Sequence, residues 1–226
     1  MAVDDFYNDP KEFLKTNVVR VGGIPVKSGE TPNSVFYLII REKEHAKVVD
    51  DSGREIGKVY DLARSDGTTG IKAYFCPYKQ NSSCFITLGA AANYMFTTQM
   101  DGCTFGIGSN AGGNILVGHA NYAAIGKEWE QGNSMALDPS GTNSAPSNVA
   151  MGRQRQRQSQ LNVLQSKMDW KGKFIKPEDY MPADAGRATT FGVRKAGGWS
   201  FYTAMYWTTD NWTFQNRGVT TRFKGI

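Results

Sequence analysis

Residues 101–119 read DGCTFGIGSNAGGNILVGH. Two apolar segments, 104–108 and 114–118, flank a loop rich in Gly and Asn, which is a strong signal for a β-hairpin. The outer neighbours of these segments, Cys103 and His119, are symmetric about the loop. Directly opposed residues of an antiparallel pair have Cβ atoms about 4.5–5.5 Å apart. The hairpin therefore predicts that the Cys103 thiol and the His119 imidazole meet.

Further strands are expected on both sides of this hairpin, in apolar segments bounded by Gly, Pro, Asn and Asp. They are 16–26, 35–40, 46–50, 56–61, 71–76 and 84–88 before it, and 188–194, 199–207 and 218–224 after it. The charged run 41–47 is expected to be exposed. Three tryptophans, Trp199, Trp207 and Trp212, accompany the last strands, where such residues most often belong to the core or to a sheet face.

Two segments are expected to be helical. Residues 89–99 are rich in alanine and predict a short helix before the Asp-Gly-Cys corner. The polar loop 138–148 ends at Asn148, which is expected to be the N-cap of a second helix over 149–168. We therefore interpret residues 1–226 as a single α+β domain in which sheet dominates and helices pack on it.

The composition is that of an ordinary globular protein. The 226 residues carry a net charge of +5 and 40% are hydrophobic, without the ~20 consecutive apolar residues that a membrane helix needs. The Arg-Gln alternation at 153–157 predicts a solvated helix face, with a polyanion contact as the weaker alternative. Residues 1–15 lack the apolar centre of a Sec signal peptide, so the protein either stays in the cytoplasm or leaves by another route. We expect neither nucleic acid nor membrane as a partner.

The three cysteines make an odd number. Cys76 and Cys84 flank a short turn, and the sequence leaves open whether they are reduced or form a disulfide. Cys103 is left over in either case, which raises the question of its reactivity. Of the two histidines, His45 lies in a charged surface run, whereas His119 follows an apolar strand.

A thiol and an imidazole in contact form a nucleophile with its base. The thiolate is the nucleophilic form, and an adjacent imidazole takes its proton and later gives it to a leaving group. Gly102 permits a sharp corner that aims backbone N–H groups at a developing oxyanion. The competing interpretation is a buried structural cysteine beside a satisfied histidine. No metal is expected, because Cys103, His119 and Asp101 lack the regular spacing of zinc ligands.

The corner 100–103, Met-Asp-Gly-Cys, followed by two apolar strands and His119, resembles the core of the Cys–His glutamine deamidase toxins. This family includes the catalytic domain of cytotoxic necrotizing factor and the Burkholderia lethal factor, and chemotaxis-receptor glutamine deamidases share a similar core. The family's hallmark is a Leu-Ser-Gly-Cys corner followed by a histidine at a separation typical of cross-strand pairing. Here Gly and Cys match, whereas Leu and Ser do not.

Two further matches extend the resemblance over about residues 70–125. Thr97 matches a threonine that orients the histidine in the lethal factor and the chemotaxis enzymes, although Thr98 is one position away. Residues 77–80, Pro-Tyr-Lys-Gln, are similar to a Pro-Trp-Lys-Gln segment of the lethal factor. The resemblance implies a β-sandwich-like mixed-sheet core flanked by helices, as in the cytotoxic necrotizing factor catalytic domain.

The resemblance also implies an activity, namely that of a secreted toxin or effector that deamidates a glutamine of a host protein. Cys103 would attack the side-chain carboxamide, His119 would protonate the departing ammonia, and Thr97 would fix the imidazole ring, as the third group does in catalytic triads. Such a protein is a bacterial virulence factor that acts in the host cell cytoplasm after export without a recognisable Sec signal. No cofactor is expected, and the protein is expected to be a monomer.

Substrate contacts are expected from residues close to the dyad. Gly102 shapes the corner, and Asn121 or Tyr122, just after the histidine, is expected to line the pocket. Asp101 is interpreted as an exposed turn residue. The surrounding loops, 77–83, 109–113 and 120–148, would recognise the target protein.

Two other functions remain open from the sequence. A transglutaminase uses the same dyad but resolves the thioester with an amine instead of water. A non-enzymatic binding module would use the aromatic-rich C-terminal sheet as its platform and would expose several tryptophans.

Overall fold

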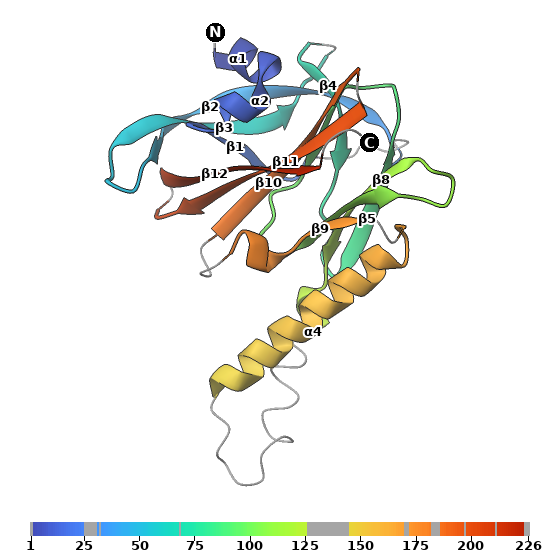
Figure 1. The fold of residues 1–226 in the computed structure, drawn as a ribbon. Helices are drawn as coiled ribbons and strands as arrows, with labels where there is room; N and C mark the ends of the chain where they lie inside the picture. The colour runs from blue at the N-terminus through green and yellow to red at the C-terminus, as the bar shows by residue number, and fades with distance from the viewer. Residues whose placement is uncertain are drawn as a thin grey trace.

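The computed structural model consists of two β-sheets and a few helices (Figure 1). The structure describes residues 2–24, 31, 33–67, 69–125, 145–169, 172–181, 186–196, 198–210 and 212–223. The predicted α+β class, with sheet dominating, is confirmed.

The large sheet has the strand order β1-β3-β2-β12-β11-β10-β6-β4. Its strands are β1 (Val18–Val21), β2 (Val35–Val49), β3 (Glu55–Arg64), β4 (Ile71–Cys76), β6 (Tyr94–Thr97), β10 (Gly186–Lys195), β11 (Gly198–Thr208) and β12 (Thr213–Phe223). The first residues of β2 also pair with β4, while its last residues pair with β12. The strands β2, β12, β11, β10, β6 and β4 therefore form a closed ring, as strands of a barrel do.

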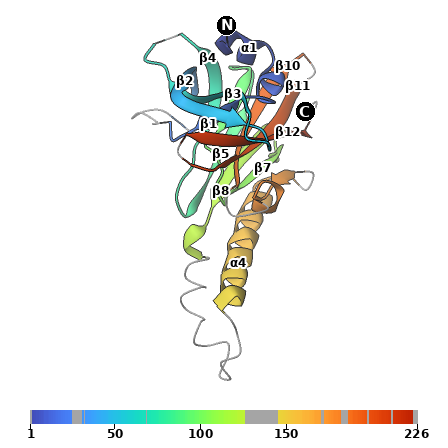
Figure 2. The ribbon, with the colours of Figure 1, turned by 90° about the vertical axis from the view of Figure 1, so that its left-hand side faces the viewer.

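The small sheet has the order β5-β8-β7-β9, and each of its pairings is antiparallel. Its strands are β5 (Ser82–Leu88), β7 (Thr104–Ser109), β8 (Ile115–Asn121) and β9 (Lys173–Ile175). One face packs against the large sheet through an apolar cluster that includes Phe105, Val117 and Phe201. The other face is covered by α4 (Ala145–Gln165), which extends beyond both sheets (Figures 1 and 2).

Helix α4 approaches the small sheet closely because the sheet presents small residues to it. Leu164 and the adjoining Met168 pack against Leu116 on β8. A Cβ atom on Gly118 would lie 2.8 Å from the side chain of Leu164, a distance that real Cβ atoms do not show. Residues alternate between the faces of a strand, so the residues of β8 that face α4 alternate with those that face the large sheet.

Two short helices, α1 (Ala2–Asn8) and α2 (Pro10–Phe13), pack on the large sheet (Figure 1). The Phe6 ring stacks on Phe96 of β6 at 6.0 Å between centroids, and the Phe13 ring lies 5.2 Å from Tyr60 of β3. Neither these helices nor β9 was predicted from the sequence. Their apolar residues are too few and too closely spaced to show a periodicity.

The helix expected over 89–99 is wrong, because residues 94–97 form β6 between β4 and β10. Met95, Phe96 and Thr97 are consecutive and all buried. A strand with a neighbour on each side and cover on both faces buries successive residues in this way, whereas a surface helix would expose some of them. The alanines that suggested a helix lie in the turn before the strand.

Helix α4 begins and ends earlier than expected. Asn148, the expected N-cap, lies inside the helix, and the helix ends at Gln165 instead of residue 168. Residues 138–144 of the expected polar loop lie outside the described residues. Within 153–157, the first three side chains are exposed as expected and the last two are half-buried.

The other expected strands are present, with differences in their bounds, and the last one, expected over 218–224, already begins at Thr213. The segment 16–26 contributes only the short β1, and its last residues, 25 and 26, lie outside the described part of the chain, as does residue 224 of the last strand. The segments expected separately at 35–40 and 46–50 are parts of the single strand β2. The charged run between them is mostly exposed, as expected, and continues the strand through an irregularity at His45, whose φ is 62°.

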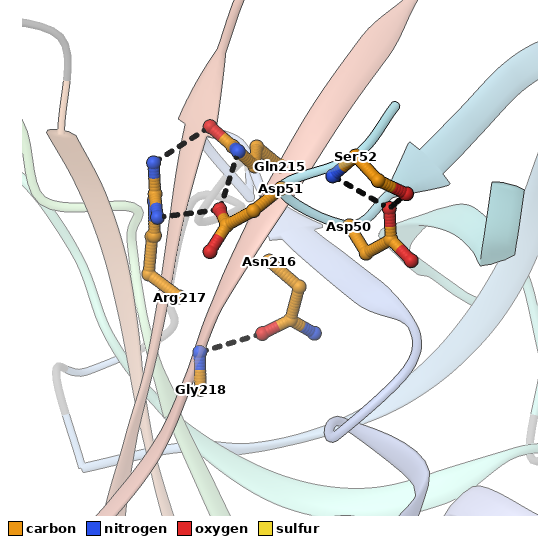
Figure 3. Close-up of polar contacts among 7 residues, drawn as sticks. All are labelled: Asp50, Asp51, Ser52, Gln215, Asn216, Arg217 and Gly218. Atoms are coloured by element: carbon orange, nitrogen blue, oxygen red, sulfur yellow. Dashed lines mark hydrogen bonds and ion pairs between the residues drawn. The ribbon is translucent and has the colours of Figure 1, made fainter. Parts of the chain in front are cut away.

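Figure 3 shows the polar contacts that join the β2–β3 turn to β12. Asp51 accepts hydrogen bonds from the side chains of Gln215 and Arg217 at 2.7 and 2.8 Å. Asn216 accepts a hydrogen bond from the backbone N–H of Gly218, whose φ of 93° favours glycine. The contacts of Asp51 hold the start of β12 beside the end of β2, where the parallel pairing completes the ring.

Candidate active site

The register of the β7–β8 hairpin differs from the expected one. Phe105 lies opposite His119, and the turn closes with a hydrogen bond of 3.0 Å from Asn110 N–H to the Asn114 carbonyl. The hairpin is thus centred on Gly112, whereas a direct pairing of Cys103 with His119 would centre it on Ala111. The prediction that Cys103 lies directly opposite His119 is therefore wrong.

Cys103 lies directly before β7, and the residue is only 2% exposed. Continuing the observed register places it opposite Asn121, whose Nδ2 donates a hydrogen bond of 3.3 Å to Sγ. Cys103 and His119 are diagonal neighbours on the face toward the large sheet, because alternate residues share a face. Nε2 of His119 has no hydrogen-bond partner among the described residues, so thiol and imidazole are not hydrogen-bonded to each other in this structure.

The tautomer of His119 follows from its contact with Thr97. Oγ1 of Thr97 lies 2.8 Å from Nδ1 of His119 and donates its own hydrogen to the Cys76 carbonyl at 3.2 Å. A hydroxyl has one hydrogen, and we assign it to the Cys76 carbonyl, which can only accept, so that Oγ1 accepts from Nδ1 and Nδ1 carries the proton. Nε2 is then the basic nitrogen. The neighbouring Thr98 accepts from the N–H of Tyr78 at 3.0 Å, so of the two threonines Thr97 is the one that binds the imidazole.

Burial keeps both members of the pair neutral. Desolvation lowers the pKa of His119 to about 4, so the imidazole is uncharged at neutral pH. Desolvation also raises the pKa of the Cys103 thiol, while hydrogen bonds from Asn121 and from the backbone of Asp101 act in the opposite direction. The resting state is therefore a neutral thiol beside a neutral imidazole, and the proton must move when a substrate arrives.

Two buried side chains that the sequence did not identify hold the backbone at Cys103. Tyr180 Oη donates a hydrogen bond of 2.6 Å to the Cys103 carbonyl, and burial raises the pKa of this hydroxyl, so it remains a donor. Gln160 of α4 donates from Nε2 to the Gly102 carbonyl at 3.0 Å and accepts at 2.6 Å from the hydroxyl of Thr104. The Gly102 carbonyl and the Cys103 N–H belong to the same peptide unit, which is planar and trans. Because Gln160 fixes this carbonyl toward α4, the Cys103 N–H points away from that helix.

Gly102 itself has a φ of 85°, a conformation that other residues rarely adopt, and so permits the corner before the nucleophile. The signal that could have revealed Gln160 is its position as a polar side chain on the same helical face as Leu164, four residues along. Tyr180 lies in an irregular turn after the short 3₁₀ helix η1 (Pro177–Asp179), and no sequence pattern marks it.

A cavity of about 370 Å³, here called the thiol cavity, opens beside Cys103. It is lined by residues that include Cys103, Asn121, Tyr78, Thr98, Asp101 and Gln99. His119 is not among its lining residues, and the 43%-exposed Tyr78 lies edge-on to the His119 ring at 6.0 Å between centroids. Tyr78 is therefore a residue that lines the thiol cavity and also neighbours the His119 ring.

The other expected site residues fall on different sides of the small sheet. Asn121 lines the thiol cavity, whereas Tyr122 packs against the apolar cluster under α4. Gly102 lines a separate cavity of about 230 Å³ beside α4. Asp101 is exposed, as expected of a turn residue, and forms an ion pair of 2.7 Å with Arg187. Of the loops expected to surround the dyad, 126–144 lies outside the described residues.

Cys76, Cys84 and Cys103 are free thiols, so the first two do not form the disulfide that the sequence left open. Cys76 is fully buried and its thiol donates to the carbonyl of Cys84 at 3.7 Å. Burial raises the pKa of Cys76 far above its usual value, so this thiol is unreactive.

Within the described ranges, no three His, Cys, Asp or Glu side chains gather as the ligands of a metal ion. No helix in the same part of the chain is long and apolar enough to cross a membrane. The sequence matches no model of a known protein family and no curated protein.

Proposed function

We propose that the protein is a cysteine hydrolase that converts a specific glutamine of a host protein to glutamate. The observation that carries the proposal is the state of His119. Its Nδ1–H is bound by Thr97, and its basic Nε2 is buried without a hydrogen-bond partner among the described residues. Buried polar groups are normally hydrogen-bonded, so an unpaired basic nitrogen on the same sheet face as a cavity-lining thiol supports a general base.

In the first half of the proposed reaction, the Cys103 thiol gives its proton to Nε2 of His119 as Sγ attacks the carboxamide carbon. The carbonyl oxygen becomes an oxyanion, for which the Cys103 N–H is the proposed donor. Collapse of this intermediate breaks the C–N bond, and the imidazolium protonates the departing nitrogen. Ammonia leaves, and the glutamyl group remains on Cys103 as a thioester.

In the second half, a water molecule attacks the thioester while Nε2 of His119 takes its proton. The C–S bond breaks, the proton returns to sulfur, and the product glutamate carries a charge that the glutamine lacked. Asn121 donates to Sγ in the resting site and thereby stabilises the negative charge that develops on sulfur. A new charge on a regulatory protein is enough to change its contacts.

The proposal includes a fold, a location and an assembly state. The resemblance of residues 70–125 to the Cys–His deamidase toxins supports a core like the catalytic domain of cytotoxic necrotizing factor. It also supports a secreted bacterial effector that acts as a monomer in the host cell cytoplasm. The packing of one sheet on the other, with helices on the outer faces, is compatible with this fold.

The test is mass spectrometry of a host-cell lysate incubated with the wild type, with Cys103→Ser or with Cys84→Ser. We expect one glutamine to become glutamate with the wild type and with Cys84→Ser, which removes the thiol that lies opposite His119 on β5 but does not line the thiol cavity. Cys103→Ser should leave that glutamine unchanged. Identical lysates in all samples would reject the deamidase and favour an aromatic binding module.

Adding a primary amine to the same incubation separates deamidation from amine transfer. A deamidase forms glutamate with or without the amine, because water reaches the thioester. Incorporation of the amine into the glutamine side chain would instead identify a transglutaminase, which uses the same two residues.

A further inference from the structure

A second cavity lies directly beside the thiol cavity. Its volume is about 540 Å³, and it shares Arg20 and Gln99 with the thiol cavity as lining residues. We call it the basic cavity, since its described lining includes Arg20, Lys43 and Arg187 as cations and Asp210 as the one carboxylate. A chain segment that places a side chain in the thiol cavity therefore passes Arg20 on its way into the basic cavity.

The carboxylate of Asp210 is directed into its own loop. It accepts hydrogen bonds of 2.7 and 2.6 Å from the N–H groups of Trp212 and Thr213. These two hydrogen bonds are the main reason why the pKa of Asp210 is lowered. The carboxylate is therefore ionised, and its negative charge is already stabilised by backbone N–H groups. Asp210 therefore does not compete for an acidic ligand, while Asp61 and Asp101 each engage one of the two arginines of the cavity.

The two arginines keep donors available for a ligand. Arg20 uses Nε for Asp61 at 3.3 Å, and its two terminal nitrogens have no acceptor in the described part of the protein. Arg187 uses Nη1 for Asp101 at 2.7 Å and for the Gly186 carbonyl. A guanidinium has five N–H donors, so each arginine can bind a further carboxylate.

The floor of the basic cavity combines these cations with aromatic rings. Trp212 is 50% exposed, and Lys43 Nζ lies 4.9 Å from the centre of its ring. The Arg20 guanidinium lies 5.7 Å from the centre of the Phe214 ring. Both rings hold the cations in place, and the exposed Trp212 also offers apolar surface to the stem of a long acidic side chain, whereas Phe214 is buried.

We propose that the basic cavity binds an acidic side chain of the substrate protein, next in the chain to the glutamine that enters the thiol cavity. The inference rests on the proposed deamidase function and adds the substrate class, namely glutamines with a neighbouring glutamate or aspartate. The carboxylate lies between Arg20 and Lys43, and the backbone of the segment crosses Gln99.

The first experiment measures binding without turnover. Short fluorescein-labelled peptides with one central glutamine, flanked by glutamate, serine or lysine, are titrated with Cys103→Ser by fluorescence anisotropy. We expect the glutamate-flanked peptide to bind about fivefold more tightly than the serine-flanked one, which corresponds to about 1 kcal/mol for a partly exposed ion pair. The preference should shrink as salt is added. Equal affinities for all three peptides would overturn the inference.

A matched pair of variants locates the site. Lys43→Gln and Lys58→Gln remove the same charge from neighbouring strands, and Lys58 forms an exposed ion pair with Glu42 outside the cavity. We expect the preference for glutamate to disappear in Cys103→Ser/Lys43→Gln and to persist in Cys103→Ser/Lys58→Gln. Loss of the preference in both variants would assign it to general charge and reject the basic cavity.

The same unlabelled peptides, incubated with the wild type and followed by mass spectrometry, separate the two proposals. Conversion of all three peptides at equal kcat/KM would preserve the deamidase and reject the acidic docking site. Preferential binding of the glutamate-flanked peptide without any conversion to glutamate would support the docking site and contradict the deamidase.

Discussion

At the scale of single residues, one hydroxyl decides how His119 reacts. Thr97 donates to the Cys76 carbonyl and accepts from Nδ1 of His119, so it selects the tautomer whose Nε2 is basic. The strand pairing of β4 with β6 places Cys76 beside Thr97 and thereby supplies the acceptor. The tautomer is thus fixed by the large sheet, whereas the histidine belongs to the small one.

Thr97→Val tests this assignment, since valine has the shape of threonine without its hydroxyl. We expect kcat on the substrate found in the lysate to fall about 10- to 100-fold, because the imidazole loses its orientation. KM should change little, as Thr97 does not line the thiol cavity. Thr97→Ser keeps the hydroxyl and should retain most activity. A variant Thr97→Val with unchanged kcat would refute the assigned tautomer.

The buried imidazole also makes stability depend on pH. Its pKa is about 4 in the folded protein and close to 6.5 when unfolded, so the unfolded chain binds more protons between these values. Stability should therefore fall as pH drops from 6.5 to 4, by up to about 3 kcal/mol from this group.

Urea unfolding at pH 7 and pH 4.5 checks this expectation, with His119→Gln as the comparison. Glutamine has no titrating group, so the variant should lose less stability between the two pH values than the wild type does. Equal losses in both proteins would show that other groups cause the acid sensitivity.

At the scale of elements, three separate pieces of chain position the start of β7. Helix α4 holds the Gly102 carbonyl through Gln160, the turn after η1 holds the Cys103 carbonyl through Tyr180, and β8 holds the thiol through Asn121. Backbone groups at the end of a strand are otherwise free to move, so these contacts give Cys103 one orientation. Gln160 and Tyr180 are positioning residues, because they act through the backbone of the nucleophile.

Tyr180→Phe removes the hydrogen bond to the Cys103 carbonyl and leaves this carbonyl buried without its donor. We expect about 1 kcal/mol less stability and a fall in kcat of about tenfold. Tyr94→Phe is the matched control, because the Tyr94 hydroxyl donates to the Tyr7 carbonyl far from the thiol cavity. The control should lose similar stability and no activity. Equal kcat for Tyr180→Phe and the wild type would assign Tyr180 a structural role alone.

The elements show which parts of the site the sequence could predict. The hairpin itself and the approach of His119 to Cys103 follow from local patterns of apolar residues and glycines. The register of the β7–β8 pairing does not follow from these patterns. Which pair of residues closes the turn, here Asn110 and Asn114, depends on which side chains and backbone groups meet in the folded turn. The local sequence around β6 predicts a helix, because the burial that makes it a strand comes from β4 and β10, which are distant in sequence.

At the scale of the whole molecule, the site lies where the two sheets and α4 meet. Thr97 comes from the large sheet, Cys103 and His119 from the small one, and Gln160 from the helix. The spacing of these layers therefore controls the geometry of the site. Glycines on the small sheet, such as Gly118, set the distance to α4.

Gly118→Ala should move α4 away from the sheet, since a Cβ atom at this position would lie 2.7 Å from Phe85 and 2.8 Å from Leu164. We expect a loss of stability of about 1–3 kcal/mol from overpacking. Activity of the folded fraction should also fall, because Gln160 moves with the helix. Gly67→Ala, where nothing lies within 4 Å, should change neither property. Calorimetry measures the stability of both variants, and an assay of the folded protein measures their activity. Normal activity in Gly118→Ala would show that the position of α4 does not affect the site.

The ring closure at β2 has a consequence for how the protein is made on the ribosome. The β7–β8 hairpin joins neighbouring segments, so it forms as soon as they emerge. The ring closes only when β12 pairs with β2, as Gln215 does with Val49, and β12 is synthesised after the other five strands of the ring. Thr97 acquires its final surroundings in that same ring. The cell that produces the protein therefore holds nascent chains in which Cys103 is present but its base is not yet oriented, until β12 has emerged and paired with β2.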